Sequence, residues 1–228
     1  MTQPGAKRLT VALLSDVLSG KGISVPPDAT EKLLLHAEEM LLWNRSIRLT
    51  AITDPAEVAV KHILDSLLLL SFAPFPGRTL DFGSGAGYPG IPLAIVLAEA
   101  RLVLLESSGK KCAFLSRACT MLGLRNAEVV PGRITAKTRL PIGRFEQIVT
   151  RATLPPSSSA ALLVPYLSPG GRLLLMTGPG RDLRGESGEG EAAGGEEKLP
   201  PGAAPGRRER FELPLRMGSR EIREILVR

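Results

Sequence analysis

The sequence predicts an α/β fold in which a mostly parallel, seven-stranded sheet has helices on both faces and carries an N-terminal helical extension. Residues 79–177 alternate short apolar runs with helical stretches, the pattern of parallel strands joined by crossover helices. A glycine-rich loop follows the first apolar run and opens a helix, as in doubly wound sheets. The chain of 228 residues is 43% hydrophobic and 23% charged, which suits one large core.

The N-terminal region, residues 1–78, is predicted to form three helices that pack on this core. Apolar residues between positions 9 and 18 share one helical face. The second helix is expected to begin at Asp28, since Asp28 and Glu31 have the spacing of a capping box. The third should begin at Asp54, with its carboxylate capping free backbone amides and Pro55 in the first helical position.

Residues 79–228 are predicted to form the second domain, which contains the sheet. The expected strands are 79–82, 102–106, 128–130, 147–150, 172–176 and a terminal pair at 210–215 and 222–227. The expected helices are about 92–98, 110–122, part of 133–139 and 157–167. Residues 178–206 contain 9 Gly and 4 Pro, too little apolar surface to offset their ordering entropy, so this stretch is expected to be a flexible insertion.

The excess positive charge is concentrated in one segment. The chain has a formal net charge of +6, and residues 79–177 alone carry +6, whereas residues 1–78 are neutral. A polyanionic partner is therefore expected to meet the chemistry in the central segment. The charge alone would equally suit a solvated basic surface.

Several classes of protein are disfavoured by what the sequence lacks. No apolar run approaches the roughly 18–20 residues that span a bilayer, and no apolar signal-peptide core follows Met1. Cys112 and Cys119, if on one helix, lie about 10 Å apart along its axis, too far for a disulfide. Two histidines and two distant cysteines give no metal-site spacing. We expect a cytoplasmic protein without a metal or a membrane contact.

The glycine loop Asp81–Gly90 predicts a cofactor site. Its glycines, among them Gly83, Gly85 and Gly87, let the backbone turn tightly and a ligand approach closely. Glu106 ends the next strand, 21 residues after Gly85, where a carboxylate can accept hydrogen bonds from both ribose hydroxyls of an adenosine cofactor.

Two cofactor classes fit this loop. A nicotinamide dinucleotide suits the G-x-G-x-x-G spacing, but Pro89 and Pro92 remove backbone donors that a pyrophosphate needs. Asp81 would repel a pyrophosphate, and it suits the cationic amino-acid end of S-adenosylmethionine. We therefore expect S-adenosylmethionine as the cofactor.

The chain resembles the ribosomal RNA small subunit methyltransferase G family, also called glucose-inhibited division protein B. The resemblance rests on Leu80–Ala94, Trp43-Asn44 with Leu49–Ile52, His62–Ser66, Glu106–Lys111 and Thr150–Ala152. It implies a Rossmann-like class I S-adenosylmethionine-dependent methyltransferase that methylates N7 of a guanine in the decoding-region 530 loop of 16S rRNA. It also implies 16S rRNA or the small ribosomal subunit as partner, and we expect a monomer.

The resemblance adds positions to those that the loop suggests. The implied cofactor-binding residues, together with Asp81, Gly85 and Gly87, are Gly83, Tyr88, Glu106, Ser107, Ser108, Ile134, Thr135 and Arg151. Thr135 departs from the family, which usually has Glu there, and Tyr88 stands where Phe or Leu is usual. Candidates for binding the RNA backbone are Lys110, Lys111, Arg117, Arg133 and Arg144.

Arg151 is the candidate for catalytic positioning. Guanine N7 offers a lone pair and has no proton to remove, so methyl transfer needs alignment more than a base. We hypothesise that the Arg151 guanidinium holds a phosphate or the guanine edge beside the methyl group. Alternatives are a methyltransferase of the same fold acting on a small molecule or protein, and an RNA-binding module that retains a cofactor pocket.

Overall fold

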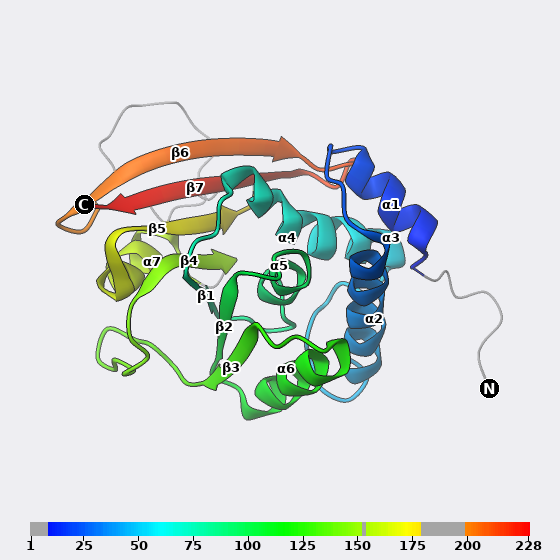
Figure 1. Cartoon of the computed structure of the whole chain (residues 1–228), viewed down its shortest axis with the longest axis horizontal. Helices are drawn as coiled ribbons and strands as arrows, with labels where there is room; N and C mark the ends of the chain where they lie inside the picture. The colour runs from blue at the N-terminus through cyan, green and yellow to red at the C-terminus, as the bar shows by residue number, and fades with distance from the viewer. Residues whose placement is uncertain (1–8, 152–153, 179–198) are drawn as a thin grey trace.

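The computed structural model describes residues 9–151, 154–178 and 199–228, which form one seven-stranded sheet flanked by helices (Figure 1). The strand order is β3-β2-β1-β4-β5-β7-β6. β1 to β5 are mutually parallel, β7 runs antiparallel to β5, and β6 runs antiparallel to β7. The strands are β1 Arg78–Phe82, β2 Arg101–Glu106, β3 Ala127–Pro131, β4 Phe145–Arg151, β5 Leu167–Thr177, β6 Ala203–Glu212 and β7 Ser219–Val227. The predicted mostly parallel, seven-stranded sheet is confirmed.

The helices cover the two faces of the sheet unequally. One face packs on N-terminal helices and on α5 and α6, and alternate residues of β2 such as Leu102 and Leu104 point to that side. The next residues along β2, Val103 and Leu105, belong to the other core, which α7 covers. The regular α-helices are α1 Val11–Ser19, α2 Pro27–Trp43, α5 Gly90–Val96, α6 Gly109–Leu122 and α7 Pro156–Leu163. Within the described ranges no helix is both long and apolar enough to span a bilayer.

The starts of the N-terminal helices follow local sequence chemistry, with one exception. Asp54 caps its helix as predicted, accepting hydrogen bonds from the amides of Ala56 and Glu57 at 3.0 and 3.1 Å. The capping box expected at Asp28 is wrong. Pro27 occupies the first helical turn of α2, so the helix begins before Asp28, which lies in its first turn.

The third N-terminal helical segment is continuous, but it changes between three types of helix along its length. It comprises α3 Pro55–Val58, the π-helix η1 Ala59–Leu64, α4 Asp65–Leu67 and the 3₁₀-helix η2 Leu68–Phe72. A π turn adds a residue to the turn and frequently occurs at functional sites. Here it contains His62 and immediately precedes Asp65.

Two further expectations need correction. The stretch 133–139 contains no helix, because the Thr135 side chain and backbone bond locally to Lys137 and Thr138 and form a turn. The insertion predicted at 178–206 ends too late, since residues from Ala203 onward pair with β7 as part of β6. Pro205 and Gly206 lie at an irregularity of that pairing, which disguises the strand in the sequence. Residues 179–198 of the insertion lie outside the described residues.

Candidate functional site

The glycine loop leaves the carboxyl end of β1 with a backbone that only glycine adopts easily. Gly83, Gly85 and Gly87 have φ angles of 77, 55 and 86°. A Cβ on Gly87 would lie 2.5 Å from the Ile91 side chain and 3.1 Å from His36 Nε2. The loop therefore packs closely against α2 and α5.

Glu106 joins this loop to the end of β2. Its Oε2 accepts a hydrogen bond from the Gly85 amide at 3.0 Å, and its Oε1 accepts one from the Ser108 amide at 2.8 Å. Only 7% of the residue is exposed. A carboxylate has about four acceptor sites, so capacity remains for ligand hydroxyl groups.

Asp81 is fully buried beneath the loop. Its Oδ2 accepts a hydrogen bond from the Gly90 amide at 3.0 Å, and its Oδ1 has no hydrogen-bond partner. Burial raises the pKa of Asp81 to about 6. A Cβ on Gly90 would lie 2.5 Å from Asp81 Oδ2, so glycine is needed where α5 begins. Asp81 thus fixes the start of α5 relative to β1.

A cavity of about 750 Å³ opens beside the loop, within the size range of small-molecule sites. Five of the predicted cofactor-binding residues line it: Gly83, Glu106, Ser107, Ile134 and Thr135. Arg133, predicted to bind RNA, also lines it. The structure therefore brings these residues together from three separate strand ends.

The other side of the cavity was missed by the sequence analysis. Arg139, Leu154 and Tyr166 contribute to its wall, and the Tyr166 hydroxyl accepts a hydrogen bond from the Leu140 amide at 2.9 Å. This bond ties the β3–β4 connection to the 3₁₀-helix η3 Val164–Tyr166. No local motif marks these residues, because they converge only through the sheet.

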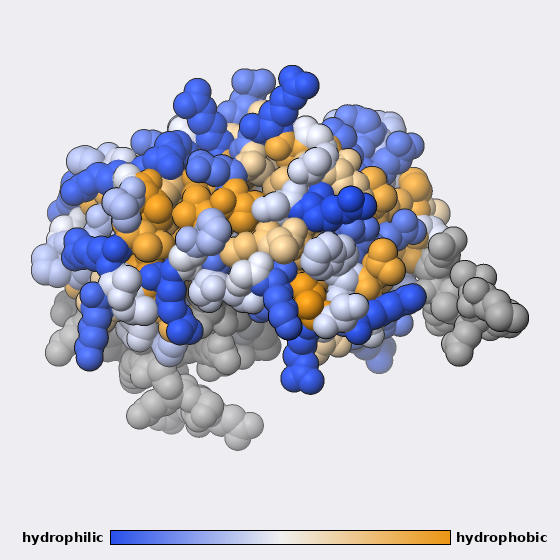
Figure 2. Space-filling view, turned by 90° about the horizontal axis from the view of Figure 1, so that it is seen from below, coloured by the Kyte–Doolittle hydropathy of each residue, from blue (hydrophilic) through white to orange (hydrophobic). Residues whose placement is uncertain are grey.

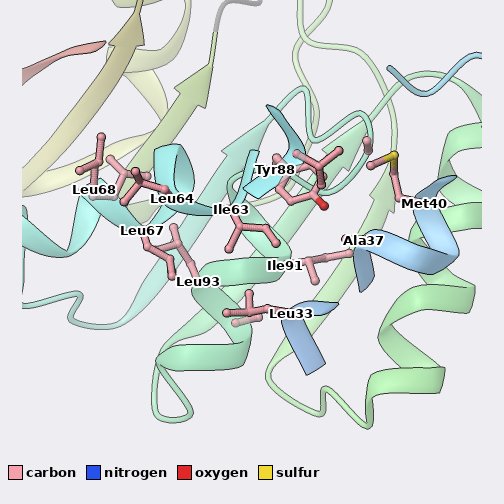
Figure 3. Packing of buried hydrophobic residues seen from close by; sticks show 14 of the residues in the cluster. Leu33, Ala37, Met40, Ile63, Leu64, Leu67, Leu68, Tyr88, Ile91 and Leu93 are labelled. Atoms are coloured by element: carbon pink, nitrogen blue, oxygen red, sulfur yellow. The ribbon is translucent and has the colours of Figure 1, made fainter. Parts of the chain in front are cut away.

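Tyr88 lies outside the cavity wall, between the chain's two histidines. Its ring centroid is 4.5 Å from that of His62, with planes 10° apart, and 4.6 Å from that of His36. His36 belongs to α2 and bonds to the Ala86 carbonyl through Nε2 at 3.0 Å. Figure 3 shows Tyr88 among Met40, Ala37 and Ile63, so the loop is packed against the N-terminal helices.

Burial keeps both imidazoles neutral. It lowers the pKa of His36 to about 4, and it lowers that of His62 to about 3 with help from the Arg151 charge. The Tyr88 hydroxyl is buried without a hydrogen-bond partner, and burial also raises its pKa. This cluster is therefore uncharged at neutral pH and serves packing rather than proton transfer.

Arg151, at the end of β4, is held by the π-helical segment. It donates to the Lys61 carbonyl at 2.8 Å and forms an ion pair with Asp65 at 3.3 Å. Asp65 is fully buried and also pairs with Arg220 of β7 at 2.5 Å. The Arg151 guanidinium carbon lies 5.7 Å from the Tyr88 ring centroid. The role of Arg220 was not foreseen, because it lies 155 residues from Asp65.

The predicted RNA-binding residues do not form one cluster. Lys110 and Lys111 lie in the first turn of α6, close to Glu106 in sequence, whereas Arg117 lies further along α6 and pairs with Glu39 of α2 at 3.2 Å. Arg144 donates to the Leu167 carbonyl at 2.9 Å, at the opposite edge of the sheet from the loop. On the side shown in Figure 2, hydrophilic side chains project outward, and hydrophobic surface is exposed between them.

Comparison with known sequences gives matches over most of the chain. A family model described as rRNA small subunit methyltransferase G matches residues 29–192. The Ribosomal RNA small subunit methyltransferase G of Anaeromyxobacter sp. (strain Fw109-5) is 38% identical over 213 residues, which cover 92% of this chain and 94% of the relative. That of Solibacter usitatus (strain Ellin6076) is 39% identical over 193 residues, covering 83% and 87%.

Solved structures resemble the fold. A methyltransferase from Pyrococcus furiosus superposes with a TM-score of 0.56 at 14% identity, covering 86% of this chain and 96% of that one. A SAM-dependent methyltransferase from Aquifex aeolicus gives a TM-score of 0.54 at 16% identity, covering 76% and 94%. At such identities the likeness concerns the fold alone.

Proposed function

The chain belongs to the rRNA small subunit methyltransferase G family, and we propose that it transfers the methyl group of S-adenosylmethionine to N7 of a guanine in 16S rRNA. The observation that carries this proposal is that Glu106, which lines the cavity, accepts a hydrogen bond from the Gly85 amide of the glycine loop, inside the region that the family model matches. The 530 loop, as implied by the family resemblance, is the proposed target.

The described residues fit S-adenosylmethionine, which supplies an activated methyl group on a sulfonium. Glu106 would accept the ribose hydroxyls through its remaining lone pairs, at the end of β2. Ile134, which is 4% exposed, presents an apolar side chain to the cavity where an adenine ring would pack. Gly83 lines the same cavity without a side chain, leaving room beside the backbone.

The polar groups of the cavity suit a reaction without a general base. Glu106 is the single carboxylate among the described residues that line it, and we assign its remaining acceptor sites to the ribose of the cofactor. Guanine N7 has a free lone pair, so the protein's task is to align it with the methyl group and exclude water. Methylation of an exocyclic amine would need an acceptor for the departing proton.

Arg151 is proposed to position the target base or an adjacent phosphate. Its side chain is 18% exposed and held from the buried side by Asp65 and the Lys61 carbonyl. A guanidinium fixed in this way offers its remaining N–H groups in one direction. Arg151→Ala is expected to lower the rate of methyl transfer, and an unchanged rate together with unchanged cofactor affinity would contradict this role.

We infer that the protein acts as a monomer in the cytoplasm, where its rRNA substrate is found.

Lys110, Lys111 and Arg133 are proposed to contact the RNA backbone. None of the three forms an ion pair within the part of the chain that the structure describes, and Arg133 lines the cavity itself. Binding should weaken steeply with salt, because phosphate contacts release counterions.

A labelling experiment separates this function from its alternatives. The protein is incubated with methyl-labelled S-adenosylmethionine and either 16S rRNA, small subunits or bulk protein, and 7-methylguanosine is mapped by mass spectrometry. Label in RNA alone supports the proposal, whereas label in protein indicates another substrate class. Cofactor binding without turnover on any RNA would indicate a binding module.

Glu106→Gln provides the matched variant. The substitution turns one carboxylate oxygen, which accepts hydrogen bonds, into an NH₂ group, which donates them. Cofactor affinity should therefore fall about tenfold or more. Glu128→Gln is the control, since Glu128 is exposed on the neighbouring strand β3. Equal cofactor affinity in the two variants would refute the proposed role of Glu106.

A further inference from the structure

The turn between β6 and β7 has an unusual backbone. Leu215 and Arg216 have φ angles of 58 and 55°, and they are the non-glycine residues with positive φ in the described chain. The Met217 amide donates to the Pro214 carbonyl at 3.2 Å, which closes a four-residue turn around them. Positive φ at both central positions is the hallmark of type I′ turns, which favour Asn-Gly. Non-glycine residues with strained backbone angles cluster at functional sites, so the turn is a candidate for one.

The two strained residues present their side chains to solvent from a fixed base. Leu215 is 59% exposed, and Arg216 is exposed with no ion pair or hydrogen bond to any described residue. The residues on either side are anchored, because Leu213 is 8% exposed in the main core and Met217 packs against that core. Folding therefore gives no reason for an apolar and a cationic side chain at this tip.

The strand register places the tip at the edge of the sheet that carries the site. Thr177, the last residue of β5, pairs with Glu221, and β6 and β7 pair two residues further, at Glu212 and Ser219. Residues 213–218 therefore project beyond the carboxyl end of β5, and Figure 1 shows the end of β6 beside α1. The next residue of β7, Arg220, joins the tip to Asp65 and through it to Arg151.

We propose that the tip formed by Leu215 and Arg216 is a contact surface for the RNA substrate. Arg216 would bind a backbone phosphate, and Leu215 would pack on an exposed base or sugar face beside the target. Residues 207–228 carry a net charge of +3, which suits a polyanionic partner such as RNA. This proposal rests on the proposed rRNA methyltransferase function.

The test replaces the tip with the sequence that its backbone prefers, Leu215→Asn with Arg216→Gly. This variant should melt at the same temperature as the wild type or higher, and bind S-adenosylmethionine equally well. Its KM for the RNA substrate should rise about tenfold or more. The control is Leu226→Asn with Arg228→Gln, which makes the same charge change at the other end of β7 and should leave KM unchanged.

A single substitution decides the matter if the double variant is less stable. Arg216→Gln should lower the slope of log affinity against log salt by about one, measured with protein-free 16S rRNA. An unchanged slope and an unchanged KM would overturn the proposal. A loss of activity seen only with assembled subunits would also overturn the proposal, because the tip would then contact a ribosomal protein and not the RNA. If the wild type itself methylates no RNA, the proposed function fails instead, and the salt slope still tests the contact.

Discussion

Replacing Asp65 by asparagine would leave two guanidinium groups facing an uncharged amide. Asp65 is fully buried, and the side chains of its partners Arg151 and Arg220 are 18% and 14% exposed. Removing one member of a buried ion pair costs about 3–5 kcal/mol. Because both arginines retain some contact with water, we expect the lower end, about 3 kcal/mol. For a chain of this size that corresponds to a fall in melting temperature of about 6–12 °C.

Chemical and thermal unfolding of Asp65→Asn, followed by circular dichroism, measure this loss. The control is Glu57→Gln in the same helical segment, where a more exposed pair with Lys61 should contribute at most about 1 kcal/mol. Combining Asp65→Asn with Arg220→Gln should cost less than the sum of the single changes, because each removes the same pair. A loss for Asp65→Asn no larger than that of the control would refute the reasoning.

Three further perturbations follow from buried groups. Tyr88→Phe removes a hydroxyl without a partner and should raise the unfolding free energy by about 1 kcal/mol, measured by urea denaturation. Gly90→Ala should destabilise by about 1–3 kcal/mol, because its Cβ would crowd Asp81 and must displace a neighbour, and thermal melting would show it. Stability should fall as pH drops from about 6.5 towards 4, since unfolding lets His36 and His62 take up protons that the fold excludes. The raised pKa of Asp81, about 6, acts in the opposite direction, because the folded protein then binds a proton that the unfolded chain does not. Between pH 7 and 5 the unfolding free energy should therefore change with pH by the equivalent of about one proton taken up on unfolding. An unfolding free energy that does not depend on pH in this range would contradict the prediction.

The sheet could be predicted because its signals are local. Each buried parallel strand is a short apolar run, and the glycine loop marks the first crossover. The start of the third N-terminal helix at Asp54 also follows from neighbouring residues. Where two local signals competed, prediction failed: Pro27 overrode the capping pattern at Asp28, and Pro205 hid the start of β6.

The site was predictable in part, and for a similar reason. The hydrogen bond between Glu106 and the glycine loop follows from the adjacent positions of β1 and β2 in the sheet. The contacts of Arg151 do not, because it bonds to Lys61 of a π-helix and to Asp65 directly after that helix, and Asp65 in turn pairs with Arg220 of the antiparallel strand β7. Periodicity analysis assumes regular winding, so it cannot reveal which side chains a π turn redirects.

The position of β7 inside the sheet has a consequence for synthesis. β6 is made before β7, yet in the described sheet it pairs with β7 alone, and β7 lies between β5 and β6. A growing chain therefore exposes the open edge of β5 until β7 is made. Asp65 also lacks its ion-pair partner Arg220 until then, because Arg220 lies 155 residues further along the chain. Unpaired strand edges make partly made chains prone to aggregate. A pause in translation after β5 and before β7 should therefore reduce the yield of folded protein more than a pause elsewhere in the chain.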